Sequence, residues 1–178
     1  MIYVFLANGF EEIEALTPVD LLRRAGFEVT TVGVGSDTVR GSHGITVTAD
    51  IPDTLYADAS PELLVLPGGM PGTLNLEKSP VVLSALRAAA RKDLPIAAIC
   101  AAPSILGHLG LLEGRRAVCY PSFEKELYGA TVTDARVERD GNIVTAVGMG
   151  AATEFSLALI ELLAGKEKTA EIARAILA

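Results

Sequence analysis

Residues 96–106 have the sequence IAAICAAPSIL, an apolar run that ends in a cysteine and is followed at once by a proline and a serine. A continuous apolar run is typical of a strand that is buried on both faces. Pro103 suits the first turn of a helix, where a missing N–H leaves no bond unmade. The segment therefore predicts a strand, a tight turn and a helix, with Cys100 in the turn.

The same alternation of apolar strands and amphipathic helices extends to both ends of the chain. We expect strands at Met1–Ala7, Phe27–Val34, Leu63–Leu66, Pro95–Ile99 and Arg116–Cys119, an extended stretch within Val39–Ala49, a hairpin of Val132–Glu138 with Ile143–Val147 around Asp140-Gly141, and helices at Glu11–Ala25, Pro80–Lys92, Pro103–Leu112, Ala151–Leu163 and Lys168–Leu177. Strands alternating with helices predict an α/β sandwich with a mostly parallel central sheet. With 178 residues, we expect one domain over residues 1–178.

The composition limits the class of protein. Half of the residues are hydrophobic but only 5% are aromatic, so the core is aliphatic. The net charge of −7 disfavours direct binding of nucleic acid. Two cysteines in a chain of this length do not form a disulfide framework. The first residues lack the basic leader of a signal peptide, and no apolar run approaches the roughly 18 residues that span a bilayer. We expect a cytoplasmic protein without membrane attachment.

Cys100 admits two interpretations. It is either a small buried hydrophobic residue, the common state of a free cysteine, or a nucleophile at a strand-to-helix elbow. In the second case the free amides of the following helix favour the thiolate and lower the pKa of the thiol. The pattern alone leaves both possibilities open.

A Pro-Gly-Gly sequence follows the strand expected at Leu63–Leu66. If the strands are neighbours, this loop, the Asn8-Gly9 turn and the Cys100 turn meet at the carboxyl edge of the sheet, where α/β proteins form their crevices. The amides of Gly69 and Ala101 could then form an oxyanion hole. The alternative is that Pro-Gly-Gly is an ordinary turn.

Glu14 lies at the margin of the apolar stripe of the first expected helix. Glu11 and Glu12 are explained by the favourable dipole at a helix N-terminus. Glu14 could instead reach the crevice, where burial and a nearby thiolate would raise its pKa and let it relay protons. The alternative is a solvated helix face.

Several short motifs in the same order along the chain together resemble the ThiJ/PfpI family, and most closely its branch with YajL and the human parkinsonism-associated deglycase. They are Gly9–Glu14, Thr17–Asp20, Leu66–Gly69, Ala98–Pro103 and Glu138–Gly141. The resemblance implies a flavodoxin-like three-layer sandwich, a homodimer, a reactive Cys100, a protonated Glu14, and amide donors at Gly69 and Ala101.

The resemblance also implies a function. We expect a cofactor-free glyoxalase or deglycase that acts on methylglyoxal, glyoxal or early glycation adducts of proteins and nucleotides, in defence against carbonyl and oxidative stress. The alternative is a peroxide sensor or redox-regulated chaperone in which Cys100 is oxidised to the sulfinate. Hydrolysis of peptides is a weaker alternative, because Ala101 stands where the peptidase-like branch has a histidine.

Other departures concern the substrate pocket. Tyr120 replaces a histidine of the human branch, and we expect it to pack over the crevice. Arg24 matches an arginine of an anion pocket in that branch, and His43 aligns with a second one. Gly68, Tyr120, Arg24 and His43 together outline a possible pocket. The loop Gly148–Ala151 replaces a Gly-Pro-Gly-Thr pattern of the family.

We expect no metal site, because the two histidines and two cysteines have no ligand spacing. His108 is expected on the surface of the helix that follows Cys100.

Overall fold

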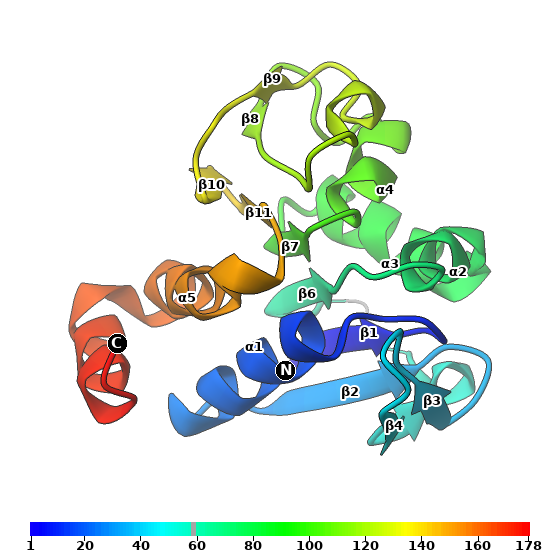
Figure 1. Cartoon of the computed structure of the whole chain (residues 1–178), viewed down its shortest axis with the longest axis horizontal. Coiled ribbons are helices and arrows are strands. Elements are labelled where there is room, and N and C mark those ends of the chain that lie inside the picture. Colours follow the sequence, from blue (N-terminus) through cyan, green and yellow to red (C-terminus); the bar gives the residue numbers. More distant parts are fainter. Residues whose placement is uncertain (58–59) are drawn as a thin grey trace.

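A computed structural model describes residues 1–57 and 60–178 of the chain (Figure 1). Its strands are β1 Ile2–Leu6, β2 Val29–Gly33, β3 Thr38–Arg40, β4 Thr46–Thr48, β5 Ile51–Pro52, β6 Leu63–Leu66, β7 Ile96–Ile99, β8 Arg116–Ala117, β9 Thr131–Val132, β10 Val137–Asp140 and β11 Ile143–Ala146. Its α-helices are α1 Glu12–Arg24, α2 Gly72–Lys78, α3 Pro80–Arg91, α4 Pro103–His108 and α5 Ala152–Ala175. Short 3-10 turns occupy Asp53–Leu55 (η1), Glu124–Glu126 (η2) and Met149–Ala151 (η3).

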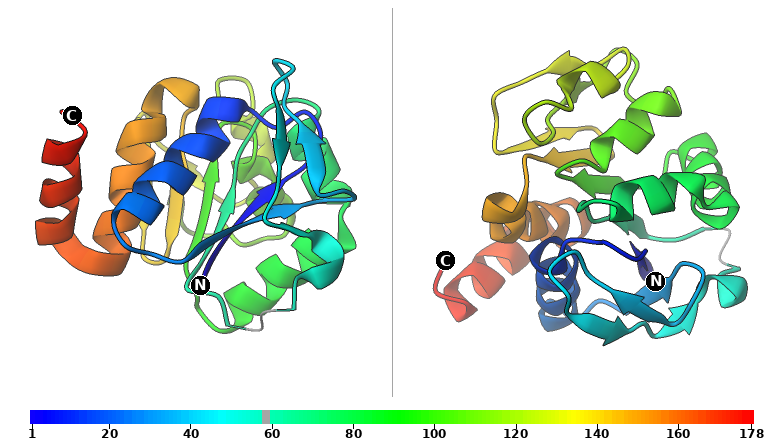
Figure 2. Two further views of the ribbon diagram at one scale, coloured as in Figure 1. Left: turned by 90° about the horizontal axis from the view of Figure 1, so that it is seen from below. Right: turned by 45° about the vertical axis from the view of Figure 1, so that its right-hand side comes forward.

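The central sheet has the strand order β10-β11-β7-β6-β1-β2-β5. Its strands are parallel to their neighbours except for β10, which is antiparallel to β11. Helices α1 and α5 cover one face, and α2, α3 and α4 cover the other (Figures 1 and 2). The α/β sandwich expected from the sequence is therefore confirmed.

Alternate residues of each central strand enter opposite halves of the core, as the two-residue period of a strand requires. In β6, Leu63 and Val65 pack under α1 and α5, while Leu64 and Leu66 pack under the other helices. All four side chains are fully buried. This explains why the strand is a continuous apolar run in the sequence.

Helix α1 has signals at both ends. The Glu11 side chain caps it by accepting a 2.7 Å hydrogen bond from the amide of Glu14. Gly26 follows with φ +91°, a left-handed conformation that ends helices and is favourable for glycine. The predicted helix over Glu11–Ala25 is confirmed within one residue at each end.

Some boundaries differ from the expectations. The helix expected over Pro103–Leu112 ends at His108, because Gly110 has φ +71° and turns the chain. The strand expected over Val132–Glu138 is wrong: the chain forms the end of β9 and the start of β10, with a loop between them. Helix α2, which directly follows the Pro-Gly-Gly loop, was not expected.

The β10–β11 hairpin and the C-terminal helices form where the sequence predicts them. Asp140 pairs with Ile143 across the Asp140-Gly141 turn, which confirms the hairpin. Helix α5 is interrupted at Gly165, whose φ of +81° and ψ of 176° are not helical, so two helical segments result. Figure 2 shows the second segment, in red, folding back in the opposite direction to the first, which is orange.

The sheet order decides where the site lies. Strands β1, β6 and β7 are adjacent and parallel, so the Asn8-Gly9, Pro67-Gly68-Gly69 and Cys100 loops meet at one edge, as expected. Strand β11 lies beside β7 and adds the loop that begins at Val147. Among the described residues, no helix is both long and apolar enough to cross a membrane.

Candidate active site

Cys100 forms a strained elbow between β7 and α4. Its φ is +66°, a value that residues other than glycine rarely adopt. Residues in such strained conformations cluster at functional sites. Two backbone hydrogen bonds hold this conformation: the Cys100 amide donates to the carbonyl of Ala146 at 2.9 Å, and the Tyr120 amide donates to the carbonyl of Cys100 at 2.8 Å. The predicted strand-to-helix turn is confirmed, and neighbouring strands fix its direction.

The sulfur lies in a half-buried position among backbone groups. The amides of Gly69 and Ala101, the two expected donors, approach the sulfur and act to lower its pKa. Gly68 permits this close approach, because a Cβ there would lie 2.6 Å from the Cβ of Cys100. The Pro-Gly-Gly loop is therefore more than an ordinary turn, since its missing side chain makes room for the sulfur.

Glu14 points inward from the first turn of α1 and is 1% exposed. Its Oε2 accepts a 2.9 Å hydrogen bond from the amide of Gly68. The backbone amide of Met149 and the thiol of Cys100 also approach the carboxyl group, and both act to lower its pKa. The alternative of a solvated helix face is wrong, because α1 begins at the crevice and places its third residue against the sulfur.

Burial governs the ionisation of both partners. Loss of solvent, with a further effect of the Glu11 charge, raises the pKa of Glu14 to about 7. Loss of solvent and the nearby Glu14 carboxylate raise the pKa of Cys100 to about 12. The first proton therefore leaves the Cys100–Glu14 pair near neutral pH, and the second is retained by the pair.

The expected lowering of the Cys100 pKa is wrong in direction. The amides of Gly69 and Ala101 do act to lower it, but burial and Glu14 outweigh them. Helix α4 contributes little, since it has only six residues. A reactive sulfur at this position therefore needs a base at the moment of reaction, and Glu14 is in contact with it.

Tyr120 lies at the rim of the site, with half of its surface exposed. Its ring approaches Gly148: a Cβ on Gly148 would lie 3.3 Å from Cδ2 of Tyr120 and 3.9 Å from Sγ of Cys100. The ring thus packs beside the crevice as expected.

His43 lies at the other side of the α1 N-terminus. Its Nδ1 is 3.1 Å from Oε2 of Glu12. The other carboxylate oxygen of Glu12, Oε1, accepts hydrogen bonds from the backbone amides of His43 and Ile45. Glu12 is 3% exposed, and these bonds lower its pKa despite burial. Glu12 therefore attaches the β3–β4 turn to α1.

The prediction of no metal site considered only histidines and cysteines. The structure gathers one potential ligand atom from each of Glu11, Glu12 and His43 within 4.8 Å of one another. The sequence could not indicate this group, because His43 is about thirty residues away from the two acids.

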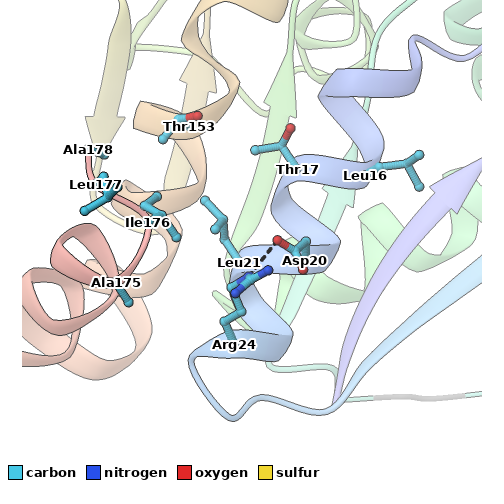
Figure 3. A pocket seen from close by; sticks show the side chains of 10 residues that line it. All are labelled: Leu16, Thr17, Asp20, Leu21, Arg24, Thr153, Ala175, Ile176, Leu177 and Ala178. Atoms are coloured by element: carbon cyan, nitrogen blue, oxygen red, sulfur yellow. Dashed lines mark hydrogen bonds and ion pairs between the residues drawn. The ribbon is translucent and has the colours of Figure 1, made fainter.

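Arg24 is not near Cys100 in this chain. It is at the opposite end of α1, about 15 Å along the helix axis from Glu14, and it is paired with Asp20 at 2.8 Å. Together with residues 175–178 it lines a cavity of 650 Å³ between α1 and the C-terminus (Figure 3). The possible pocket of Gly68, Tyr120, Arg24 and His43 is therefore not formed as one site within the chain.

His108 is more constrained than a plain surface residue. Its Nδ1 contacts a carboxylate oxygen of Glu77, and its Nε2 is 2.9 Å from Oε2 of Glu126. These carboxylates raise the pKa of His108 against the opposing effect of burial. The residue connects α2, α4 and η2 and takes no part in the Cys100 site.

The sequence connects the loop Gly148–Ala151 with the substrate pocket, but it does not predict the contacts of Gly148 and Met149. The Met149 amide approaches the Glu14 carboxyl and acts to lower its pKa, and Gly148 lies between Tyr120 and the sulfur. The order β11-β7 brings their loop to the site. The sequence does not show this position, because it does not reveal that β11 pairs in parallel with β7.

The chain is similar to known proteins over nearly its whole length. Residues 1–162 match the DJ-1/PfpI family. Protein dj-1beta of Drosophila melanogaster is 39% identical, with 98% of this chain and 95% of that protein covered. The glutathione-independent glyoxalase DJR-1.2 of Caenorhabditis elegans is 30% identical, with 89% and 86% covered. This chain spans less than half of the length of two longer relatives from Arabidopsis thaliana.

The fold agrees with these relatives. The structure of oxidised Toxoplasma gondii DJ-1 matches with a TM-score of 0.95 and 38% identity, covering 99% of this chain and 97% of that one. The sandwich is therefore of the flavodoxin-like type found in these proteins. The ThiJ/PfpI resemblance of the sequence motifs is confirmed, and the chain belongs to the DJ-1/PfpI family.

Proposed function

We propose that this protein is a cofactor-free, cysteine-dependent glyoxalase or deglycase. The observation that carries the proposal is the Cys100–Glu14 pair, in which a half-buried thiol contacts a buried carboxyl group whose pKa is about 7. A base that titrates near neutral pH is well matched to proton transfer. A glyoxalase among the relatives supports the same chemistry.

The first step joins the sulfur to an aldehyde carbon. Ionised Glu14 accepts the thiol proton as Cys100 attacks the carbonyl, which gives a hemithioacetal. The new oxyanion forms next to the sulfur, where the amides of Gly69 and Ala101 can donate to it. This order of events fits a thiol with a raised pKa, because no free thiolate has to accumulate.

The second step converts an α-oxoaldehyde to a hydroxy acid. Protonated Glu14 first gives the thiol proton to the oxyanion, which completes the hemithioacetal and returns Glu14 to the carboxylate. Glu14 then takes the proton from the former aldehyde carbon and returns it to the adjacent carbon through an enediolate, while the hydroxyl proton of the first carbon passes to the neighbouring oxygen. The first carbon is thereby oxidised to a thioester and its neighbour is reduced to an alcohol, so no external oxidant or reductant is required. Water then cleaves the thioester, which releases lactate from methylglyoxal or glycolate from glyoxal and restores the thiol.

Early glycation adducts of proteins and nucleotides can enter the same sequence. The sulfur displaces the amine from the hydroxyl-bearing carbon: the C–N bond breaks, the S–C bond forms, and ionised Glu14 takes the thiol proton and passes it to the leaving amine. The product is the same hemithioacetal, and the later steps are unchanged.

A steady-state assay with methylglyoxal tests this proposal. We expect the wild-type protein to form lactate, Cys100→Ser to be inactive, and Glu14→Gln to lose on the order of 10²-fold or more in kcat. Cys119→Ser is the matched control and should retain activity. Lactate formation that persists in Cys100→Ser would overturn the proposal.

A second candidate function rests on the same pair. Cys100 is partly exposed, and Glu14 is placed to hydrogen bond an oxidised sulfur. One similar structure is described as oxidised. A peroxide sensor or redox-regulated chaperone would use oxidation of Cys100 to the sulfinate.

We further propose that the chain acts as one domain and assembles as a homodimer in the cytoplasm. The exposed apolar side chains of Ile13, Leu16 and Ile45 support dimerisation, because they occur together around the first turns of α1 and the adjoining β3–β4 turn.

A further inference from the structure

A small cavity adjoins the Cys100–Glu14 pair on the side of Tyr120. It has a volume of 350 Å³ and lies between the Tyr120–Pro121 segment and the loop from Val147 to Ala151. Tyr120 and Met149 are each about half exposed at its mouth, at 50% and 52%. The sequence analysis connects Tyr120 and the loop Gly148–Ala151 with the substrate pocket but assigns this cavity no ligand, and neither oxyanion donor lines it.

Gly148 connects this cavity to the sulfur. It lines the cavity, and a Cβ at its position would lie 3.7 Å from Oε1 of Glu14 and 3.9 Å from Sγ of Cys100. Because glycine has no side chain, nothing projects from this position between the cavity and the reacting pair. A substrate whose carbonyl carbon is at Sγ can therefore extend its substituent into the cavity.

The lining favours an apolar and planar substituent. Tyr120 supplies an aromatic ring, Met149 a polarisable thioether, and Pro121 and Val147 further apolar surface. Aromatic rings and thioethers both make favourable contacts with the face or edge of another ring. The volume is ample, because a cavity of about 150 Å³ is enough to bind benzene.

The charged residue in the lining is already neutralised. Nε of Arg136 donates to both carboxylate oxygens of Glu154, at 3.0 and 2.8 Å, and Nη2 donates to the carbonyl of Gly150 at 2.6 Å. A phosphate or carboxylate group on the substrate would meet a guanidinium whose charge Glu154 already offsets. The cavity is therefore suited to an uncharged group.

We propose that this cavity is a binding subsite for the aryl group of an aryl-substituted α-oxoaldehyde, with Tyr120 and Met149 as the residues that determine specificity. The proposal rests on the proposed glyoxalase function and specifies its substrate class. It predicts that phenylglyoxal is a better substrate than methylglyoxal, which leaves the cavity empty.

The first experiment compares kcat/KM for phenylglyoxal and methylglyoxal. We expect a ratio of at least tenfold in favour of phenylglyoxal in the wild-type protein. Tyr120→Ala and Met149→Ala should each lower this ratio at least fivefold, mainly through KM for phenylglyoxal. Leu55→Ala, which removes a large apolar side chain that is 66% exposed and does not line the cavity, is the matched control and should keep the wild-type ratio.

The second experiment does not depend on turnover. Cys100 is alkylated with iodoacetamide or with its N-phenyl derivative iodoacetanilide, and both rates are divided by those of N-acetylcysteine. In each reaction the sulfur displaces iodide, and the thiol proton passes to Glu14. We expect the rate with iodoacetanilide to saturate with reagent concentration. After normalisation it should be at least tenfold higher than the rate with iodoacetamide. Tyr120→Ala should remove most of this difference in rate.

The two experiments separate the subsite from the function. If the phenyl reagent is favoured but no aldehyde is turned over, the subsite stands and the glyoxalase proposal fails. If both aldehydes are turned over equally and the two reagents match N-acetylcysteine, the subsite is refuted and the glyoxalase proposal stands. Loss of the preference in Leu55→Ala would also refute the assignment to Tyr120 and Met149.

Discussion

The amide nitrogen of Gly68 lies 2.9 Å from Oε2 of Glu14, a residue 54 positions earlier in the chain. This hydrogen bond joins the loop after β6 to the first turn of α1 and fixes the carboxyl group against Cys100. It forms because β1 and β6 are neighbours and because Gly68 has no side chain.

Gly68→Ala should therefore damage the site. The new Cβ would lie 2.6 Å from the Cβ of Cys100 and 2.7 Å from Oε2 of Glu14. We expect a loss of about 1–3 kcal/mol in the free energy of unfolding from overpacking, together with loss of activity. Gly150→Ala is the matched control, since a Cβ there meets nothing within 4 Å. Equal stability of the two variants in urea denaturation would contradict this account.

The buried Glu14 carboxyl should make stability depend on pH. Its pKa is about 7 in the folded protein, against an unperturbed value of 4.5. The folded state therefore binds more protons between these values, and stability falls as pH rises through this window. Between pH 4.5 and 8 the wild-type protein should lose about 3 kcal/mol relative to Glu14→Gln.

Urea denaturation of both proteins at several pH values measures this difference. Glu12, Asp50 and His108, whose pKa values are also shifted, are present in both and cancel. A constant difference between wild type and variant would show that Glu14 does not titrate in this range.

The sequence was sufficient to predict the main features of the site. Cys100 follows from the end of an apolar run before Pro103, and Glu14 follows from its place at the margin of a helical stripe. Strand order was the missing information for Met149, because only the pairing of β11 with β7 brings its loop to the sulfur. The direction of the thiol pKa shift was also beyond the sequence, since it depends on how deeply Glu14 and Cys100 are buried together.

Two limits of sequence analysis concern the fold. The helix after Cys100 was expected to be longer, because Leu109, Leu111 and Leu112 continue its apolar pattern although Gly110 ends it. Arg24 and His43 were expected in one pocket from the resemblance, but they lie near opposite ends of α1. The ten residues from Glu14 to Arg24 correspond to about 15 Å along a helix, a separation that a match of motifs does not reveal.

The two thiols should differ in reactivity. Cys119 is 4% exposed and its pKa is raised to about 11 by burial, whereas Cys100 is partly accessible and contacts a base. We expect iodoacetamide to label Cys100 first at neutral pH, at a rate that rises through about pH 7 as Glu14 ionises. Peptide mass spectrometry measures both rates. Faster labelling of Cys119, or an unchanged pH profile in Glu14→Gln, would refute the role of Glu14 as base.

A homodimer would cover the apolar surface at the start of α1. Ile13 and Ile45 are 48% and 55% exposed, and the Ile45 amide donates to Glu12 at 3.3 Å, so the two segments adjoin. Light scattering should give about twice the chain mass of 18.6 kDa. Ile13→Asp should shift the protein toward the monomer, because a charge is costly in an apolar interface. Leu55→Asp, a control at a position that is 66% exposed, should remain dimeric.

The response to peroxide distinguishes the two candidate functions at Glu14. Two molecules of hydrogen peroxide convert the Cys100 thiol to the sulfenate and then to the sulfinate, each transferring one oxygen and leaving as water. We expect mass spectrometry to show two added oxygens in the wild-type protein. Glu14→Gln should still form this product, because its amide can hydrogen bond the oxidised sulfur. Glu14→Leu should not stop at the sulfinate, since it removes that donor.

Aldehyde turnover should respond differently to the same variants. The rearrangement needs a group that gains and loses protons, so Glu14→Gln should be nearly inactive with methylglyoxal even though it forms the sulfinate. If Glu14→Gln retains full turnover while Glu14→Leu loses the sulfinate, Glu14 is only a hydrogen-bond donor and the sensor function is favoured. If neither variant changes either measurement, the carboxyl that contacts Cys100 in the structure has no part in its chemistry, and the proposed active site is wrong.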